Sequence, residues 1–234
     1  KVGINGFYKP DSACQAMKAA PLSYSLEDIW TCLNTDLTNL KTFNMKASAQ
    51  TVKNNQVSFF MNTALKYRNA RGASDLTPIE STSQQIGVER SDLGSWLWKT
   101  GTPKTYKLSD RHIFSDRFMM EFQYSHVGNN FALTFHEEAL RDVQPTFEIT
   151  NSMNGRSSAE SVYVRPTGSV DITGNYFAPG WLGGDHAFKF GFKYRDDIAH
   201  SESMTGGDAT ARFRSGVASE ANLVRRSITE YGLE

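Results

Sequence analysis

Apolar and polar residues alternate strictly along several segments of the chain. The clearest segment has an aromatic residue at every second position and basic residues between them: Phe188, Phe190, Phe192 and Tyr194 against Lys189, Lys193 and Arg195. Alternation with a period of two is typical of a β-strand with one apolar and one polar side. Six segments show it, at 43–50, 57–68, 106–109, 118–125, 164–176 and 188–195. Helical spacing is absent from these segments, so the sequence predicts an all-β, antiparallel fold.

The connections between these segments alternate in length. Short links occur near Lys53, near Ser115 and near Pro179, whereas long polar links span 69–103, 128–161 and about 196–226. In an antiparallel meander every second connection lies at the same end of the sheet. The pattern therefore predicts tight turns at one end and long loops at the other, which is typical of outer-membrane β-barrels with short periplasmic turns.

The composition of the two strand sides favours a transmembrane β-barrel over a soluble β-sandwich or jelly roll. The apolar side is rich in Phe and Tyr, which suits a lipid interface. The polar side carries full charges in the middle of long strands, and these residues are predicted to face the lumen: Lys46, Lys66, Arg68, Glu121, Asp171, Lys189, Lys193 and Arg195. A wide barrel keeps such a wet interior whatever it transports, so no single residue is assigned to a ligand.

The number of strands predicts an arc of a larger barrel. Two further strands are expected, one beginning near Leu223 and one near Val2. Six to eight strands would crowd the charged lumen-facing side chains, since a small barrel fills its interior with packed side chains. We therefore expect an open, curved antiparallel sheet whose first and last strands do not pair. Residues 1–40 are predicted to form an extracellular loop region with the candidate first strand, and residues 41–234 the barrel strands, turns and loops.

Composition narrows the function classes further. The 234 residues contain 25 Lys plus Arg and 25 Asp plus Glu, which argues against a nucleic-acid partner. The mean hydropathy is −0.47, and no apolar run approaches the ~20 residues of a membrane helix. Average hydropathy does not detect a barrel, because the apolar band occupies every second residue. The opening residues do not form a signal peptide, as expected of a mature or fragmentary chain.

Two cysteines, Cys14 and Cys32, lie in one polar stretch that also contains Pro21, Ser23 and Tyr24. In a cytosolic protein they would be two free thiols without metal-ligand spacing. In an exported protein they would pair and close an exposed loop. The barrel interpretation favours the disulfide.

No arrangement of residues indicates catalysis, so the chain is not expected to be an enzyme or to hold a cofactor or metal. The five histidines lie on different segments, and neither His-x-x-x-His nor Cys-x-x-Cys occurs. His136-Glu137-Glu138 is expected to be a solvated part of a loop. A Gly-x-Ser-x-Gly nucleophile elbow is absent, and Gly183-Gly184-Asp185 is interpreted as a turn.

Three segments resemble Oar-like TonB-dependent outer-membrane receptors. They are 66–74 (KYRNARGAS), 106–114 (YKLSDRHIF) and 183–195 (GGDHAFKFGFKYR), and the likeness covers roughly residues 41–234. The resemblance implies a barrel of about twenty-two strands in the bacterial outer membrane. It also implies an N-terminal plug and coupling to the TonB protein through a TonB box. Neither the plug nor the TonB box is recognisable here, so the chain looks like a middle segment of such a barrel.

The interpretation as a barrel segment predicts two alternative functions. The first is part of a TonB-dependent transporter that takes up an unidentified nutrient or peptide, with membrane lipid, the plug and the TonB protein as partners. The alternative is a surface structural or adhesion barrel whose long loops bind partners without active transport.

Overall fold

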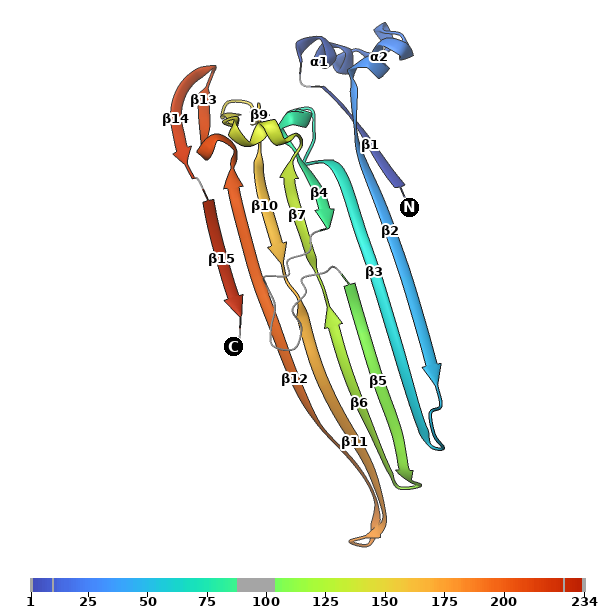
Figure 1. Cartoon of the computed structure of the whole chain (residues 1–234). Coiled ribbons are helices and arrows are strands. Elements are labelled where there is room, and N and C mark those ends of the chain that lie inside the picture. Colours follow the sequence, from blue (N-terminus) through green and yellow to red (C-terminus); the bar gives the residue numbers. More distant parts are fainter. Residues whose placement is uncertain (1, 10, 88–103, 225, 233–234) are drawn as a thin grey trace.

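The computed structural model describes residues 2–9, 11–87, 104–224 and 226–232, and it is dominated by antiparallel β-sheet (Figure 1). The all-β prediction is therefore confirmed. The main sheet is 11-stranded. Its strands are β1 (Val2–Tyr8), β2 (Leu33–Ala49), β3 (Asn55–Arg71), β4 (Ser83–Gly87), β5 (Lys104–Ser115), β6 (Phe118–Val127), β7 (Asn130–Phe135), β10 (Ala159–Val164), β11 (Thr167–Trp181), β12 (Gly184–Thr205) and β15 (Arg226–Gly232). Within the described residues no helix is long and apolar enough to cross a membrane.

The sheet is a meander in which some pairs of strands lie end to end beside one longer strand. β3 pairs with β5 over its first half and with β4 near its end. β12 pairs with β11 over its first half and with β10 over its second half. β6, which pairs with β11, and β7, which pairs with β10, also lie end to end. Figure 1 shows the resulting long, narrow sheet, with β1 and β2 on one side and β12 and β15 on the other.

The two ends of the sheet differ as the sequence predicts. Tight turns at 50–54, 116–117 and 182–183 join β2 to β3, β5 to β6 and β11 to β12, and all three lie at the bottom of Figure 1. We call this the hairpin end and the opposite end of the sheet the loop end. The last of these turns uses Leu182 and Gly183, with φ of 49° and 83°. The expected turn at Gly183-Gly184-Asp185 is thus displaced towards Leu182, and Gly184 already belongs to β12.

Successive turns are staggered along the strand direction. A row of paired residues starts at Asn55 beside the first turn and runs through His112, Met120 and Gly174 to Phe190. β5 and β11 both continue beyond this row before they turn, and β11 continues further than β5. A line through the turns is therefore oblique to the strands, and such a tilt is what closing a sheet into a barrel requires.

The long connections are more ordered than the sequence suggests. The links 69–103, 128–161 and 196–226 were expected to be loops, yet their described parts contain β4, β7, β10 and the extension of β12 to Thr205. Residues 88–103 and 225 of these links lie outside the described residues. The links 128–161 and 196–226 also form a second, 4-stranded sheet at the loop end. Its members are β14 (Val217–Leu223), β13 (Ala209–Arg214), β8 (Thr146–Glu148) and β9 (Met153–Gly155), accompanied by η2 (Ile79–Ser81), η3 (Glu138–Asp142) and η4 (Gly206–Asp208). A short strand offers few alternating positions, so the sequence pattern is weaker here.

One glycine allows these connections to approach closely. A Cβ atom on Gly206 would lie 2.6 Å from the carbonyl oxygen of Val143 and 2.8 Å from Oγ of Ser157. Real Cβ atoms do not come that close to backbone oxygens, so only glycine fits between η3 and η4 without a shift of the backbone.

The N-terminal region contains two short helices that were predicted to be an exposed loop. They are α1 (Ser12–Ala19) and α2 (Leu26–Cys32), separated by η1 (Pro21–Ser23). The Asp11 side chain accepts a hydrogen bond from the Cys14 amide at 2.9 Å, and Ser25 and Asp28 form a capping box at the start of α2. Local capping therefore sets both helices, which are too short to show a helical period in the sequence.

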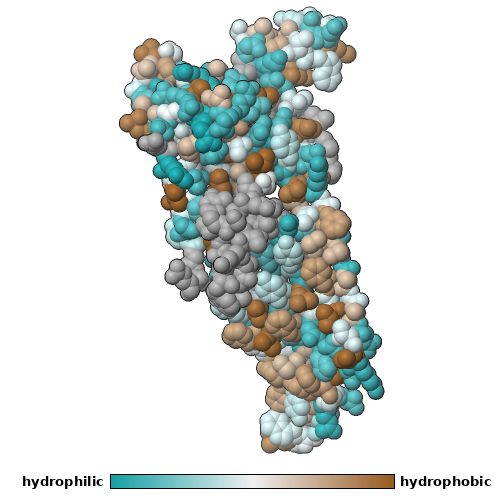
Figure 2. Space-filling view, viewed as in Figure 1, coloured by the Kyte–Doolittle hydropathy of each residue, from teal (hydrophilic) through white to brown (hydrophobic). Residues whose placement is uncertain are grey.

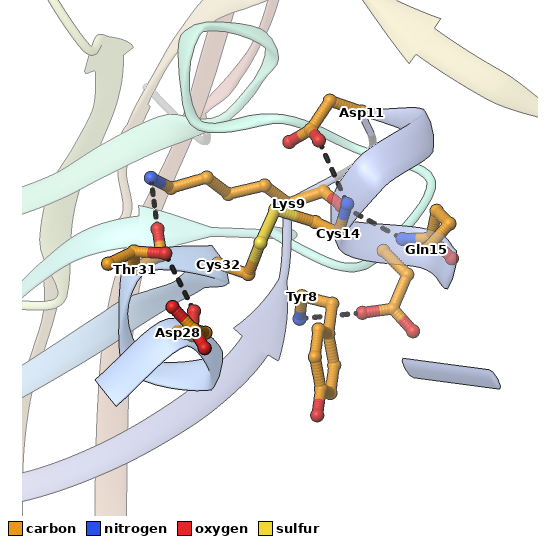
Figure 3. Close-up of a disulfide and its surroundings, with 9 residues drawn as sticks. Tyr8, Lys9, Asp11, Cys14, Gln15, Asp28, Thr31 and Cys32 are labelled. Atoms are coloured by element: carbon orange, nitrogen blue, oxygen red, sulfur yellow. Dashed lines mark hydrogen bonds between the residues drawn. A yellow bond between two sulfur atoms is a disulfide. The ribbon is translucent and has the colours of Figure 1, made fainter. Parts of the chain in front are cut away.

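A disulfide between Cys14 and Cys32 joins the two helices, as the barrel interpretation predicts (Figure 3). Both cysteines are buried, and the Lys9 ammonium beside them donates to the Thr31 carbonyl oxygen at 2.7 Å. The Tyr8 amide donates to Asp75 Oδ1 at 2.9 Å, and Lys18 forms an ion pair with the same carboxylate. We call residues 8–32 the helical cap, since the disulfide and Asp75 fasten this segment at the loop end.

Replacing both cysteines by serine is expected to loosen the helical cap and to leave the main sheet intact. A bridge across this sequence separation of 18 contributes about 3 kcal/mol in the chain-entropy model. Hydrogen exchange of α1 and α2 should accelerate strongly, while exchange in β11 and β12 stays unchanged. Equal acceleration in the hairpins would contradict a local role.

Candidate functional site

One face of the main sheet is apolar from β2 to β12. Residues paired directly across an antiparallel ladder place their side chains on the same face. Phe192 pairs with Ile172, which pairs with Phe122, so all three share a face. The apolar face also includes Met45, Phe59, Leu108, Phe118, Tyr176, Phe188 and Phe190.

Aromatic rings of β6, β11 and β12 lie close together on the apolar face. The ring of Phe118 stacks on that of Phe190 with a centroid separation of 6.4 Å and meets Tyr176 edge-on at the same distance. Phe190 lies over Gly174, because a Cβ atom there would come within 2.4 Å of the Phe190 ring. The missing side chain of Gly174 thus makes room for this ring in the middle of the strand.

No second layer among the described residues covers the apolar face near the hairpin end. Phe190 is 52 % exposed and Phe192 is 63 % exposed. In a soluble β-sandwich such rings would pack against a second sheet. Figure 2 shows hydrophobic residues gathered over the half of the molecule towards the hairpin end, whereas the loop end is mainly hydrophilic. The apolar face is therefore a broad exposed surface rather than a core.

The opposite face is polar, and it carries every residue that the sequence predicts to line a lumen. Asp171 pairs with Lys193, and Ser169 beside it pairs with Arg195. The register places the whole predicted set on this polar face: Lys46, Lys66, Arg68, Glu121, Asp171, Lys189, Lys193 and Arg195. The separation of Phe188, Phe190, Phe192 and Tyr194 from Lys189, Lys193 and Arg195 also follows the register. What each face contacts remains a prediction.

Ion pairs link part of the polar face across neighbouring strands. Lys193 Nζ lies 3.3 Å from Asp171 Oδ1, and Arg111 lies 3.1 Å from Glu121. Ser169 donates to Asp171 at 3.1 Å. These pairs are largely exposed, so each contributes about 0–1 kcal/mol to stability.

Several cations on the polar face have no such partner. No carboxylate of the described residues is within ion-pair distance of Lys46, Lys66 or Lys189. This face therefore has a surplus of positive charge, which attracts anions.

Arg68 has a structural role that the sequence pattern does not reveal. Its Nε donates to Asp36 Oδ2 at 2.5 Å, and the Asp36 carboxylate also accepts from the Ala70 amide at 3.2 Å. Asp36 is only 3 % exposed. A buried carboxylate needs such partners, so Arg68 is committed to this pair rather than free to contact a solute.

A polar group interrupts the apolar face near the hairpin end. Asp110 shares the apolar face with Val57 and Phe122, which it pairs with. Its carboxylate accepts a hydrogen bond from Asn55 Nδ2 at 2.5 Å, and Asn55 Oδ1 accepts from Thr51 at 2.5 Å. Sequence alternation alone misses this cluster, because Asn55 comes from the turn region of another strand.

The loop end carries a carboxylate that fastens two connections together. Glu148 accepts backbone hydrogen bonds from Thr150 at 2.9 Å, from Ser215 at 3.0 Å and from Gly216 at 2.9 Å. Ser215 and Gly216, with φ of 51° and 77°, form the tight turn between β13 and β14. Hydrogen bonds from the Thr150 and Gly216 amides and from the Thr150 hydroxyl lower the pKa of Glu148 to about 2.

Acid is therefore expected to release the β13–β14 turn. Because folding lowers the pKa of Glu148, the stabilisation is present above the ordinary pKa of 4.5 and is lost as the pH falls towards 2. Exchange protection of the Ser215 and Gly216 amides should decrease over that range. Glu148→Gln should remove this pH dependence, and protection that stays constant down to pH 2 in the unaltered protein would contradict the assignment.

Within the described residues, no group of three His, Cys, Asp or Glu side chains is arranged to hold a metal ion. His136, Glu137 and Glu138 lie at the end of β7 and the start of η3. Trp181 lies at the hairpin end beside Phe188, with ring centroids 5.4 Å apart.

Comparison with family models, with curated proteins and with solved structures gives no match for this chain. The resemblance to Oar-like receptors accordingly stays a prediction, and what the structure establishes is an antiparallel all-β protein with one apolar and one polar face.

Proposed function

We propose that the chain is an arc of a transmembrane β-barrel in the bacterial outer membrane. The observation that carries this proposal is the uncovered aromatic face, on which Phe190 and Phe192 are more than half exposed. Exposed apolar patches of this kind mark contact with lipid or protein, and aromatic residues are enriched where barrels meet the membrane interface. The charged opposite face suits a wet barrel interior.

The free edges of the sheet support an arc rather than a small closed barrel. Within the described residues β1 and β15 do not pair with each other. Among the strands that the structure describes, the first half of β12 pairs on one side only, with β11, and the second half of β2 pairs on one side only, with β3. Unpaired backbone groups in hydrocarbon cost several kcal/mol each, so in a membrane these edges require further strands.

The function proposed for the complete barrel is energy-coupled uptake of a nutrient or peptide. In this proposal the polar face lines the interior, and its unpaired cations Lys46, Lys66 and Lys189 meet a plug domain or an anionic solute. Coupling to the TonB protein rests on the resemblance of three segments to Oar-like receptors. Uptake that persists after deletion of the TonB protein would contradict energy coupling through TonB, but it would not contradict the proposal of a barrel.

A surface-binding barrel is the second candidate, and one observation favours it. The helical cap at the loop end exposes Leu22, Leu26 and Trp30, with Leu22 fully exposed. Exposed apolar side chains on an ordered surface are suited to binding another protein. Cell adhesion that is lost on Trp30→Ser, with uptake unaffected, would support this alternative.

Membrane facing can be tested by cysteine scanning of β12. Single cysteines at 188, 190 and 192 should be protected from a membrane-impermeant maleimide in vesicles, and those at 189, 193 and 195 should react. The native cysteines are paired and will not interfere. In the unfolded protein, in denaturant without detergent, cysteines at all positions should react with the maleimide alike, which serves as the control. Reactivity without a two-residue period in vesicles would overturn the barrel proposal.

A further inference from the structure

A cationic hollow lies at the hairpin end of the apolar face. It has a volume of about 400 Å³ and is lined by Arg117, Tyr176, Ala178, Pro179, Trp181 and Phe188. Arg117 comes from the turn between β5 and β6, and Trp181 ends β11. The stagger of the turns brings these two residues together, because β11 extends past the turn that carries Arg117.

Two donors in this hollow are unused. Among the described residues the Arg117 guanidinium has no ion-pair or hydrogen-bond partner, and its only bonds are those of its backbone amide to Ser115 and of its backbone carbonyl with Phe177. The Trp181 indole N–H likewise has no partner there, and the side chain is about half exposed. Both groups are therefore available to an acceptor from outside the chain.

A second hollow adjoins the first and is wholly apolar. It has a volume of about 510 Å³ and is lined only by Phe118, Tyr176, Phe188 and Phe190. Tyr176 and Phe188 line both hollows, so the two hollows lie next to each other. A ligand that fills both must have an anionic end and an apolar chain.

We propose that these two hollows form a phospholipid site, in which Arg117 and the Trp181 indole bind the headgroup phosphate and glycerol region and an acyl chain lies along Phe118 and Phe190. Planar guanidinium groups bind phosphate through paired hydrogen bonds, and indole rings favour the headgroup region of a bilayer. The site rests on the proposed barrel, since the hairpin end would then lie at the level of the lipid headgroups.

The test uses short-chain phosphatidylglycerol as the probe and native mass spectrometry of the full chain as the readout. Arg117→Gln should weaken binding at least about ten-fold, since a hydrogen bond to a charged group contributes about 1.5–3 kcal/mol and 1.4 kcal/mol corresponds to a factor of ten. Arg117→Lys should retain part of the affinity. Arg214→Gln, an exposed arginine at the loop end, is the matched control and should bind as the unaltered protein does.

Two further probes separate the sources of affinity. Inorganic phosphate should compete weakly, and a diacylglycerol with the same chains but no phosphate should bind less well than the phospholipid. Equal binding of the diacylglycerol, competition by phosphate at the same concentration as the lipid, or no effect of Arg117→Gln would each overturn the site. Cysteine scanning of β12 reports membrane facing independently, so loss of the lipid site and loss of the barrel proposal remain distinguishable.

Discussion

Phe192→Arg is expected to impair insertion into lipid vesicles by about 2–4 kcal/mol, the cost of a basic side chain on the lipid face of a barrel near the bilayer centre. Phe192 is the appropriate position because it is 63 % exposed and lies in the middle of the aromatic run of β12. Its ring has little protein packing to lose. The measurement is a reversible urea titration in vesicles, followed by circular dichroism.

Thr173→Arg provides the matched control. Thr173 pairs with Gly191 and Glu121, so it lies on the polar face in the same part of the sheet. In the proposed barrel an arginine there faces the polar interior and has the Glu121 carboxylate opposite it, so the change in insertion free energy should stay below about 1 kcal/mol. Equal effects of the two arginines would show that the aromatic face does not contact lipid.

Arg68→Met is expected to lower the free energy of unfolding by about 3 kcal/mol. The substitution removes the partner of Asp36 and leaves a carboxylate that is 3 % exposed with a single hydrogen bond, from the Ala70 amide. Breaking a buried pair from one side costs about 3–5 kcal/mol, and the partial exposure of Arg68 places this pair near the lower bound.

A double-mutant cycle isolates the pair. Asp36→Asn combined with Arg68→Met removes both charges, so the double variant should be more stable than Arg68→Met alone. If Arg68 served only to bind a solute, Arg68→Met would leave unfolding unchanged and affect transport alone. Lys66→Met, at an unpaired cation of the same strand, should leave stability within about 0.5 kcal/mol.

The sequence predicts which residues share a face of the sheet better than it predicts where each strand begins and ends. The two faces of β12 follow from alternation, because neighbouring side chains of a strand point to opposite sides whatever their tertiary context. β2 begins at Leu33, earlier than the expected start near Phe43, since residues 33–42 are mostly polar and their pairing with β1 and β3 decides their structure. Pairing with neighbouring strands thus extends a strand into residues whose sequence shows no alternation.

The site residues divide in the same way. All eight charged positions were predicted to share one face, and the register places them there. The Asp36–Arg68 pair, the Asp110–Asn55 hydrogen bond and the hollow beside Arg117 join residues from different strands. Which residues become neighbours across strands depends on register and stagger, and neither can be read from a single strand.

The meander order also has a consequence for the speed of assembly. Strands that follow one another in the chain mostly pair with one another. The three tight hairpins therefore close the shortest loops. Folding rates fall as the mean sequence separation of contacts rises, because loop closure must precede the contacts that reward it. The sheet can therefore grow hairpin by hairpin, with β2–β3, β5–β6 and β11–β12 as separate starting points, and each new strand meets an edge that is already formed.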